Sequence, residues 1–197
     1  MNLVARVQAI LLKPKEEWVK IKGESTPVAQ LFTSYAAVLA AIPAIGQFIG
    51  YGLIGISIPF AGVYRFGLGT SLLRAIIYYV LILVSAYIFG MIINALAPSF
   101  GSKPSLENAM KLAVYSMTPA WIGGVFYIIP ALGVLAILAS LYGLYILYLG
   151  FSSPMMDTPK EKVMGYIVVS VVVVAVLMFV VGLVLGLVFA VGRFPGI

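Results

Sequence analysis

The sequence contains no cysteine and no histidine. The absence of cysteine excludes disulfides, thiolate nucleophiles and thiolate metal ligands, and the absence of histidine removes the commonest metal ligand and general base. A serine or tyrosine nucleophile would need an activating base, and none is recognisable in the sequence. We therefore expect no catalytic residue, no metal site and no cofactor, and we predict that the protein is not an enzyme.

Carboxylates are also scarce, with six Asp and Glu residues in a chain of 197. Proton-relay transporters and intramembrane hydrolases usually carry ionisable groups within their membrane spans. Here we expect every carboxylate in the N-terminal segment, in a loop or at the end of an apolar run: Glu16, Glu17, Glu24, Glu107, Asp157 and Glu161. This distribution argues against both classes of protein.

Apolar residues dominate what remains, because 63% of the chain is hydrophobic and only 9% is charged. A soluble domain carries about 25% charged residues, so lipid must solvate much of this chain. Five runs approach the ~20 apolar residues that cross a bilayer, at about 28–48, 72–96, 109–129, 132–151 and 163–191. The pattern predicts an all-α fold, a polytopic transmembrane helix bundle of about five spans, as one domain over residues 27–197.

The glycine-rich stretch 50–69 fits three structures. It can extend the first span to Ile58, form a re-entrant segment, or form an interfacial segment before Arg65. Hydropathy does not distinguish these, and all three remain open.

The segment 1–26 is predicted to form two short amphipathic helices on the membrane surface. Leu3, Val7, Ile10 and Leu11 follow helical spacing along one face, with Arg6 on the other side. A second interpretation is that this segment is a docking surface for a soluble protein partner.

The second of these helices is predicted to begin at Pro14, since proline is favoured in the first helical position, and to end at Gly23. Trp18 is expected on its apolar side at the depth of the lipid headgroups, where tryptophan is common.

The third predicted span contains Tyr115, Pro119 and Trp121. Pro119 cannot donate to the helical ladder, so it should kink the span. The simplest interpretation is a kink packed by aromatic residues, and the alternative is a ligand cleft opened by the kink. A short turn at Pro130 then makes the third and fourth spans an antiparallel hairpin, and Tyr142 is expected on one face of the fourth span with two further tyrosines.

The polar loop before the fifth span carries Asp157, Thr158, Pro159 and Glu161. Thr158 followed three residues later by Glu161 resembles a capping box, with Pro159 in the first helical position. The loop therefore predicts the start of the fifth helix.

The chain carries a net charge of +6, and in a membrane protein the distribution of its Lys and Arg residues between the loops sets topology. With five spans, nine Lys and Arg fall on the side of the N terminus and three on the other side. The positive-inside rule then predicts a cytoplasmic N terminus and a C terminus outside, in the cell inner or plasma membrane. The basic residues are dispersed, so we expect contact with membrane lipids and no nucleic-acid binding.

Four stretches together resemble the Yip (Ypt-interacting protein) domain family, in its prokaryotic-type branch. They are residues 10–21, ILLKPKEEWVKI; residues 113–124, AVYSMTPAWIGG; residues 142–150, YGLYILYLG; and residues 157–162, DTPKEK. The resemblance implies five spans, a cytosolic N terminus and no known enzymatic activity. Eukaryotic members are linked to Rab-type GTPases and vesicle traffic, but this chain lacks the long acidic or polar N-terminal domain that many of them carry.

Two functions are compatible with these features. The first is a non-enzymatic, membrane-organising or partner-recruiting scaffold with a protein partner at the cytosolic face. Glycines spaced along the spans allow helices to pack closely, so the scaffold could also form a homo-oligomer. The alternative is a small-solute, ion or lipid channel or transporter, because Pro43, Pro119 and residues 50–69 suggest the broken helices that transporters use at binding sites.

Overall fold

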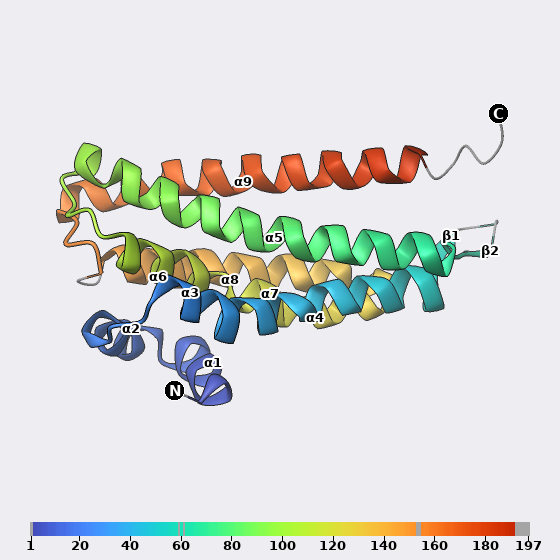
Figure 1. The fold of residues 1–197 in the computed structure, drawn as a ribbon, viewed down its shortest axis with the longest axis horizontal. Coiled ribbons are helices and arrows are strands. Elements are labelled where there is room, and N and C mark those ends of the chain that lie inside the picture. Colours follow the sequence, from blue (N-terminus) through green and yellow to red (C-terminus); the bar gives the residue numbers. More distant parts are fainter. Residues whose placement is uncertain (1, 59, 61, 153–154, 192–197) are drawn as a thin grey trace.

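The computed structural model describes residues 2–58, 60, 62–152 and 155–191. Long helices lie side by side in a bundle, and two short helices lie against one end of it (Figure 1). The elements, in chain order, are α1 Leu3–Leu12, α2 Pro14–Gly23, α3 Val28–Leu31, α4 Ala37–Gln47, β1 Ile56–Ile58, β2 Gly62–Tyr64, α5 Leu68–Leu96, α6 Leu106–Ser116, α7 Thr118–Gly123, α8 Gly133–Ser152 and α9 Lys160–Val191.

The predicted helical bundle is confirmed. Within the described part of the chain, four continuous helical stretches are long and apolar enough to cross a membrane: Val28–Ile54, Leu68–Phe100, Pro130–Phe151 and Lys160–Leu187. The first of them joins α3 to α4 through a π-helical segment, Phe32–Ala36, and continues through a second one, Phe48–Ile54.

The third predicted span is not one continuous helix, which corrects the prediction for residues 109–129. The chain breaks between α6 and α7, and a 3-10 segment, Gly124–Ile128, follows. Pro119 explains the break, since it offers no N–H to the carbonyl of Tyr115. The pieces nevertheless follow one another along the bundle, because α6 lies where α5 ends and α8 begins at the opposite end (Figure 1).

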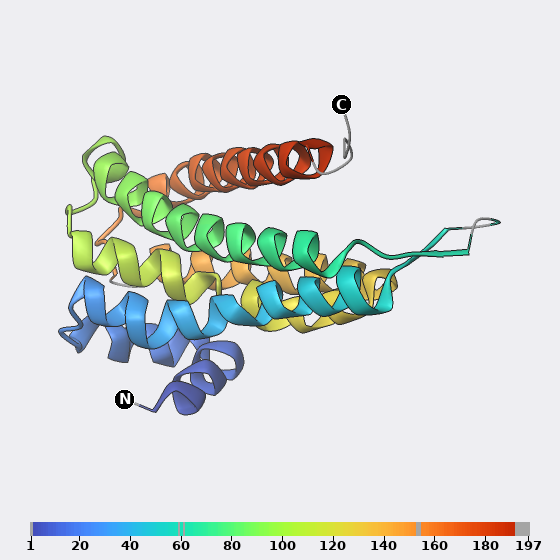
Figure 2. The ribbon, with the colours of Figure 1, turned by 45° about the vertical axis from the view of Figure 1, so that its right-hand side comes forward.

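Residues 50–69 combine two structures. The first span continues as helix to Ile54, and an antiparallel hairpin then pairs Ile56 with Tyr64. This hairpin projects beyond the helices in Figure 2. Gly55 has φ +91°, a left-handed conformation that favours glycine, and it makes the turn from helix to strand.

The two ends of the bundle differ in charge. The end that holds α1, α2 and the starts of α6 and α9, which we call the polar end, carries all six carboxylates of the chain. The end with β1 and β2, which we call the hairpin end, carries Arg65 and Arg74 among the described residues.

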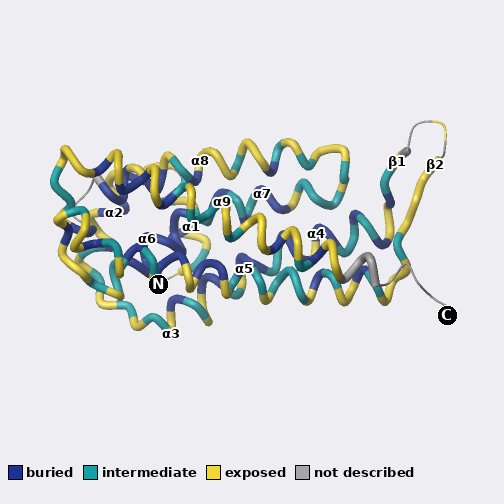
Figure 3. Tube along the Cα trace, turned by 90° about the horizontal axis from the view of Figure 1, so that it is seen from above, coloured by how far each residue is buried: buried dark blue, intermediate teal, exposed yellow. Residues whose placement is uncertain are grey.

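Burial is uneven along the helices (Figure 3). Every residue of α6 from Ala109 to Ser116 is buried, so that α6 lies at the centre of the fold. In α9, only 11% of the most apolar stretch is buried, compared with 44% in the first long helix. Where two segments approach most closely, a glycine makes room. At Gly124, for example, a Cβ would lie 2.3 Å from Cβ of Pro43.

Candidate functional site: a buried charge cluster at the polar end

Arg6 of α1 is buried in the interior of the protein, with 2% of its surface exposed. The prediction that it lies on the outer side of α1 is therefore wrong. Its guanidinium donates hydrogen bonds to the carboxylates of Glu17 and Glu24, and its Cζ lies 5.6 Å from the ring centroid of Tyr115. A buried charge needs such partners, because its desolvation is costly.

Lys111 of α6 is the second buried cation, with 1% exposed. Its Nζ donates to the carbonyls of Ile21 and Glu24 and lies 2.7 Å from the carboxylate of Glu107. Glu107 also accepts from the backbone N–H of Thr26 at 2.8 Å. The lysine thus caps the last carbonyls of α2, where a positive charge is favoured by the helix dipole.

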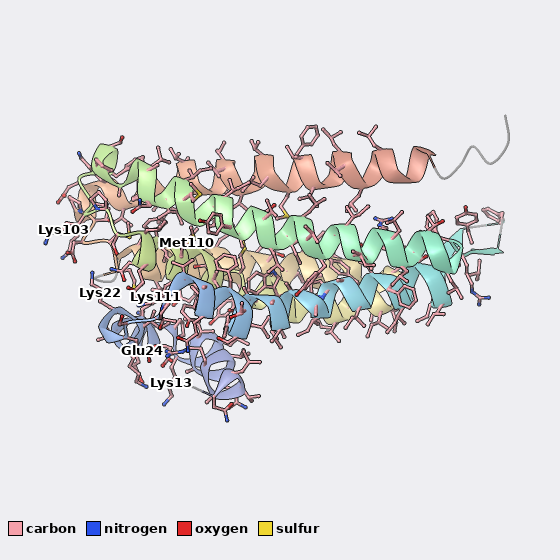
Figure 4. All side chains as sticks on the ribbon, in the orientation of Figure 1. Lys13, Lys22, Glu24, Lys103, Met110 and Lys111 are labelled. Carbon is pink, nitrogen blue, oxygen red and sulfur yellow. The ribbon has the colours of Figure 1, made fainter. Side chains whose placement is uncertain are left out.

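These five residues, Arg6, Glu17, Glu24, Glu107 and Lys111, form what we call the charge cluster. Figure 4 shows Glu24 and Lys111 at the point where α2 meets the bundle. Burial lowers the pKa of Arg6, but its hydrogen bond to Glu24 and the nearby negative charges outweigh this effect, so that its pKa lies above the usual value. The cluster fastens both N-terminal helices to α6.

Trp18 is completely buried inside the protein, so its ring contacts the helix bundle and not the lipid headgroups. Its indole N–H donates to the carbonyl of Ile146 in α8 at 3.0 Å, and its ring packs edge-on against Tyr115 at 6.2 Å. Gly150 makes room, since a Cβ there would lie 2.9 Å from the Trp18 ring. The apolar side of α2 therefore faces protein and not lipid.

Tyr115 lies at the centre of these contacts. Its ring also packs edge-on against Tyr35 at 4.8 Å, and the Tyr35 hydroxyl lies 2.8 Å from that of Thr118. Tyr35 belongs to a π-helical segment and Thr118 begins α7, so the irregular part of one crossing meets the break in another. Irregular turns of this kind are frequent at functional sites.

A cleft of about 320 Å³ opens beside Tyr35 and Tyr115. Its walls also include the carboxylate of Glu24 and several polar side chains of the α2–α3 connection and the start of the first crossing: Ser25, Thr26, Gln30 and Ser34. Its lining is mainly polar, and it is large enough for a small ligand.

Two other predicted residues also join the N-terminal helices to the site. Pro14 is buried in the first turn of α2, as predicted for the helix start. Tyr142 is exposed on α8, and its hydroxyl donates to the carbonyl of Leu11 at 2.7 Å. Tyr142 therefore ties α8 to the end of α1.

Asp157 and Pro159 lie near the cluster but outside it. Asp157 lies 3.2 Å from Lys103 and 3.7 Å from Lys22, and its hydrogen bond with Lys103 and the charge of Lys22 hold the pKa of its carboxyl below the usual value. Pro159 directly precedes α9. The Thr158 hydroxyl lies 2.8 Å from that of Ser102, so this contact replaces the predicted capping box.

Pro119 and Trp121 are buried farther along the bundle, beside a different and mainly apolar cavity of about 300 Å³. This cavity lies among α5, α7, α8 and α9, and Ser116 and Met117 at the helix break line it. Tyr78 and Tyr127 also line it. The kink thus accompanies a cavity, and the predicted site residues divide between two separate places.

Sequence reasoning identified neither Tyr35 nor any residue of the charge cluster as a member of a site. The sequence does contain one indication for Lys111. A lysine in the first turns of an apolar run is a candidate for a buried partner as well as a charge that sets topology. Among the described residues, no group of three or more Asp and Glu is placed to hold a metal ion.

Comparison with known proteins shows the family of the chain. The Yip1 domain model matches residues 9–184, a range that includes Glu17, Tyr115 and the helix break. The chain belongs to the Yip1 domain family. Inner membrane protein YohC of Escherichia coli K12 is 26% identical over 133 residues, covering 68% of this chain and 68% of YohC, and YohC of E. coli O6:H1 matches equally. No solved structure matches the chain.

Proposed function

We propose that this Yip1-family protein is a non-enzymatic scaffold of the inner membrane that recruits a protein partner through the outer face of α1 and α2. The observation that carries the proposal is that both helices are fastened to the bundle while their outer face stays uncovered. Fixing a binding surface in advance lowers the entropy that a partner must lose on binding.

The outer face combines apolar and basic side chains. Val4, Leu12 and Val19 are exposed, Leu12 to 78%. Lys13 and Lys15 are also exposed. Since exposed apolar side chains outside the spans are unfavourable in water, a partner with a mixed acidic and apolar surface fits this face.

The same proposal places the polar end in the cytoplasm. Nine of the twelve Lys and Arg residues lie there, and the positive-inside rule favours that orientation. Because the chain has no cysteine, single substitutions give unambiguous labelling sites. In intact cells, Ser57→Cys in the hairpin should react with an impermeant maleimide, and Lys15→Cys should react only after the membrane is opened.

Photo-crosslinking in native membranes tests recruitment. The crosslinker is placed at Leu12 or Val19, with Ile137 on the exposed side of α8 as the matched control. A discrete protein adduct formed from α1 or α2 and not from Ile137 supports the scaffold. Adducts to lipid alone at all three positions refute recruitment and make the face a membrane-surface anchor.

The transport alternative is supported by the cavity beside the helix break, since discontinuous helices line the substrate sites of many transporters. Purified protein in liposomes should then move ions, small solutes or labelled lipid, and Leu141→Trp, at an exposed position in the cavity wall, should reduce that flux. Without any flux above that of empty liposomes, this alternative fails.

A further inference from the structure

The polar cleft lies where the chain enters the first crossing. Gln30 and Ser34, in the first turns of that crossing, are exposed at its mouth, whereas Tyr35 and Tyr115 are buried at its inner end. Polar side chains at the start of a crossing belong at the depth of water and lipid headgroups. The cleft is therefore open both to small solutes and to the headgroups of neighbouring lipids.

The Tyr115 hydroxyl makes no hydrogen bond to the described residues. Only 2% of the residue is exposed, yet its oxygen is not one of the fully buried unpaired atoms and is reached from the cleft that it lines. Buried tyrosine hydroxyls normally find a partner. In this protein, the hydroxyls of Tyr35 and Tyr79 do so, with Thr118 and the carbonyl of Ala37 respectively. Because Tyr115 lines the cleft, an occupant of the cleft can supply the missing partner.

The charge around the cleft favours a cation. The charge cluster holds three carboxylates and two buried cations, which leaves a net charge of −1. Glu24 is the one charged residue that lines the cleft, and 40% of its side chain is exposed. Lys20 lies 3.5 Å from Glu17, but its ammonium is in solvent and is screened there.

The surroundings of Tyr115 also select the kind of cation. Arg6 lies over its ring, and the rings of Tyr35 and Trp18 pack against it edge-on. The ring face is thus occupied, and the hydroxyl is the part of the side chain that remains to bind. A hydroxyl oxygen and a carboxylate both accept hydrogen bonds, so a cation that binds to both must carry N–H donors.

We propose that the cleft binds a primary ammonium group, which donates hydrogen bonds to the Glu24 carboxylate and to the Tyr115 hydroxyl. A group of the size of ethanolamine fits the available 320 Å³. The ammonium can come from the headgroup of an aminophospholipid at the mouth of the cleft or from a free small amine.

The test uses the full-length protein in two settings. In maltoside micelles, ethanolamine is titrated against choline at matched ionic strength, and binding is followed by thermal shift. In nanodiscs, phosphatidylethanolamine is compared with phosphatidylcholine in a phosphatidylglycerol background, and bound lipid is counted by native mass spectrometry. Choline and phosphatidylcholine keep the charge but lack N–H donors.

Tyr115→Phe removes only the unpaired hydroxyl and should leave the unliganded melting temperature unchanged. It should weaken ammonium binding about tenfold, as expected for the loss of one hydrogen bond to a charged group. Tyr145→Phe, which removes an exposed hydroxyl on α8, is the matched control and should bind normally. If Tyr115→Phe does not fold, Ser34→Trp blocks the mouth from an exposed position and should abolish binding.

Saturable binding of ethanolamine in micelles identifies a free amine as the source, and binding in nanodiscs alone identifies the lipid. Equal binding of the methylated and unmethylated ligands overturns the proposal. So does unchanged affinity in Tyr115→Phe. If neither setting shows binding, the cleft holds water only and the proposal is refuted, while recruitment by α1 and α2 remains separately testable by crosslinking.

Discussion

Replacing Arg6 by methionine should detach the N-terminal helices from the bundle. The substitution keeps an unbranched side chain but leaves Glu24 without its cation and Glu17 with only the solvent-exposed Lys20. Removing one partner of a buried ion pair costs about 3–5 kcal/mol. The Glu17 side chain is 7% exposed and counts almost fully, whereas the Glu24 side chain is 40% exposed and is partly stabilised by water. We therefore expect the low end, about 3 kcal/mol.

Unfolding in mixed micelles, followed by circular dichroism during titration with SDS, gives the free-energy difference. Hydrogen exchange should show faster exchange in α1 and α2 than in α5. Lys15→Met, at an exposed position with no ion pair among the described residues, is the control and should change stability by less than about 0.5 kcal/mol.

A triple substitution separates the loss of the ion pairs from other effects. Adding Glu17→Gln and Glu24→Gln to Arg6→Met removes the orphaned charges and should recover at least half of the lost stability. If Arg6→Met is no more destabilising than Lys15→Met, the charge cluster does not fasten the helices and the reasoning is wrong.

Three further predictions concern packing and pH. Trp18→Phe keeps an aromatic ring but removes the hydrogen bond to the Ile146 carbonyl, which retains its helical partner within α8, and it should lower unfolding free energy by about 0.5–1.5 kcal/mol. Gly150→Ala should cost about 1–3 kcal/mol, because its Cβ would lie 2.2 Å from Leu112, whereas Gly182→Ala meets nothing within 4 Å and should be neutral by the same titration. Because the folded protein lowers the pKa of Asp157, its contribution to stability should be complete above the unfolded value of about 3.9 and disappear as pH falls through the lower folded value. The melting temperature of the unsubstituted protein should therefore fall between pH 5 and 3, and that of Asp157→Asn should fall less over the same range.

The positions of the long helices were predictable because lipid solvation demands long apolar runs. The division of the third crossing was only partly predictable. Pro119 indicated a kink, but a kinked helix and two separate helices have the same hydropathy. Packing decides between them here, since Gly143 of α8 approaches the Ser116 carbonyl so closely that a Cβ would lie 2.7 Å away.

The buried positions of Arg6 and Trp18 could not be predicted, for a common reason. An amphipathic helix shows which side is apolar, but lipid and the surface of a protein bundle satisfy that side equally well. The pattern also treats an arginine as polar, whereas two carboxylates of α2 and the α2–α3 connection allow Arg6 to be buried. Only tertiary contacts between distant segments could reveal the charge cluster.

The sparse packing of α9 has a consequence for the folding of the protein in the bilayer. Lipid tails are as apolar as the valines and leucines of its later turns, so separating those turns from their neighbours exposes nothing that the surroundings reject. The first turns differ, because Tyr166 is fully buried and its hydroxyl donates to the carbonyl of Ile93 in α5. The side chains of α9 gain little from the bundle, since only 11% of its most apolar stretch is buried. The later turns of α9 should therefore separate from the bundle at little cost in the bilayer, while Tyr166 keeps the start of the helix on α5.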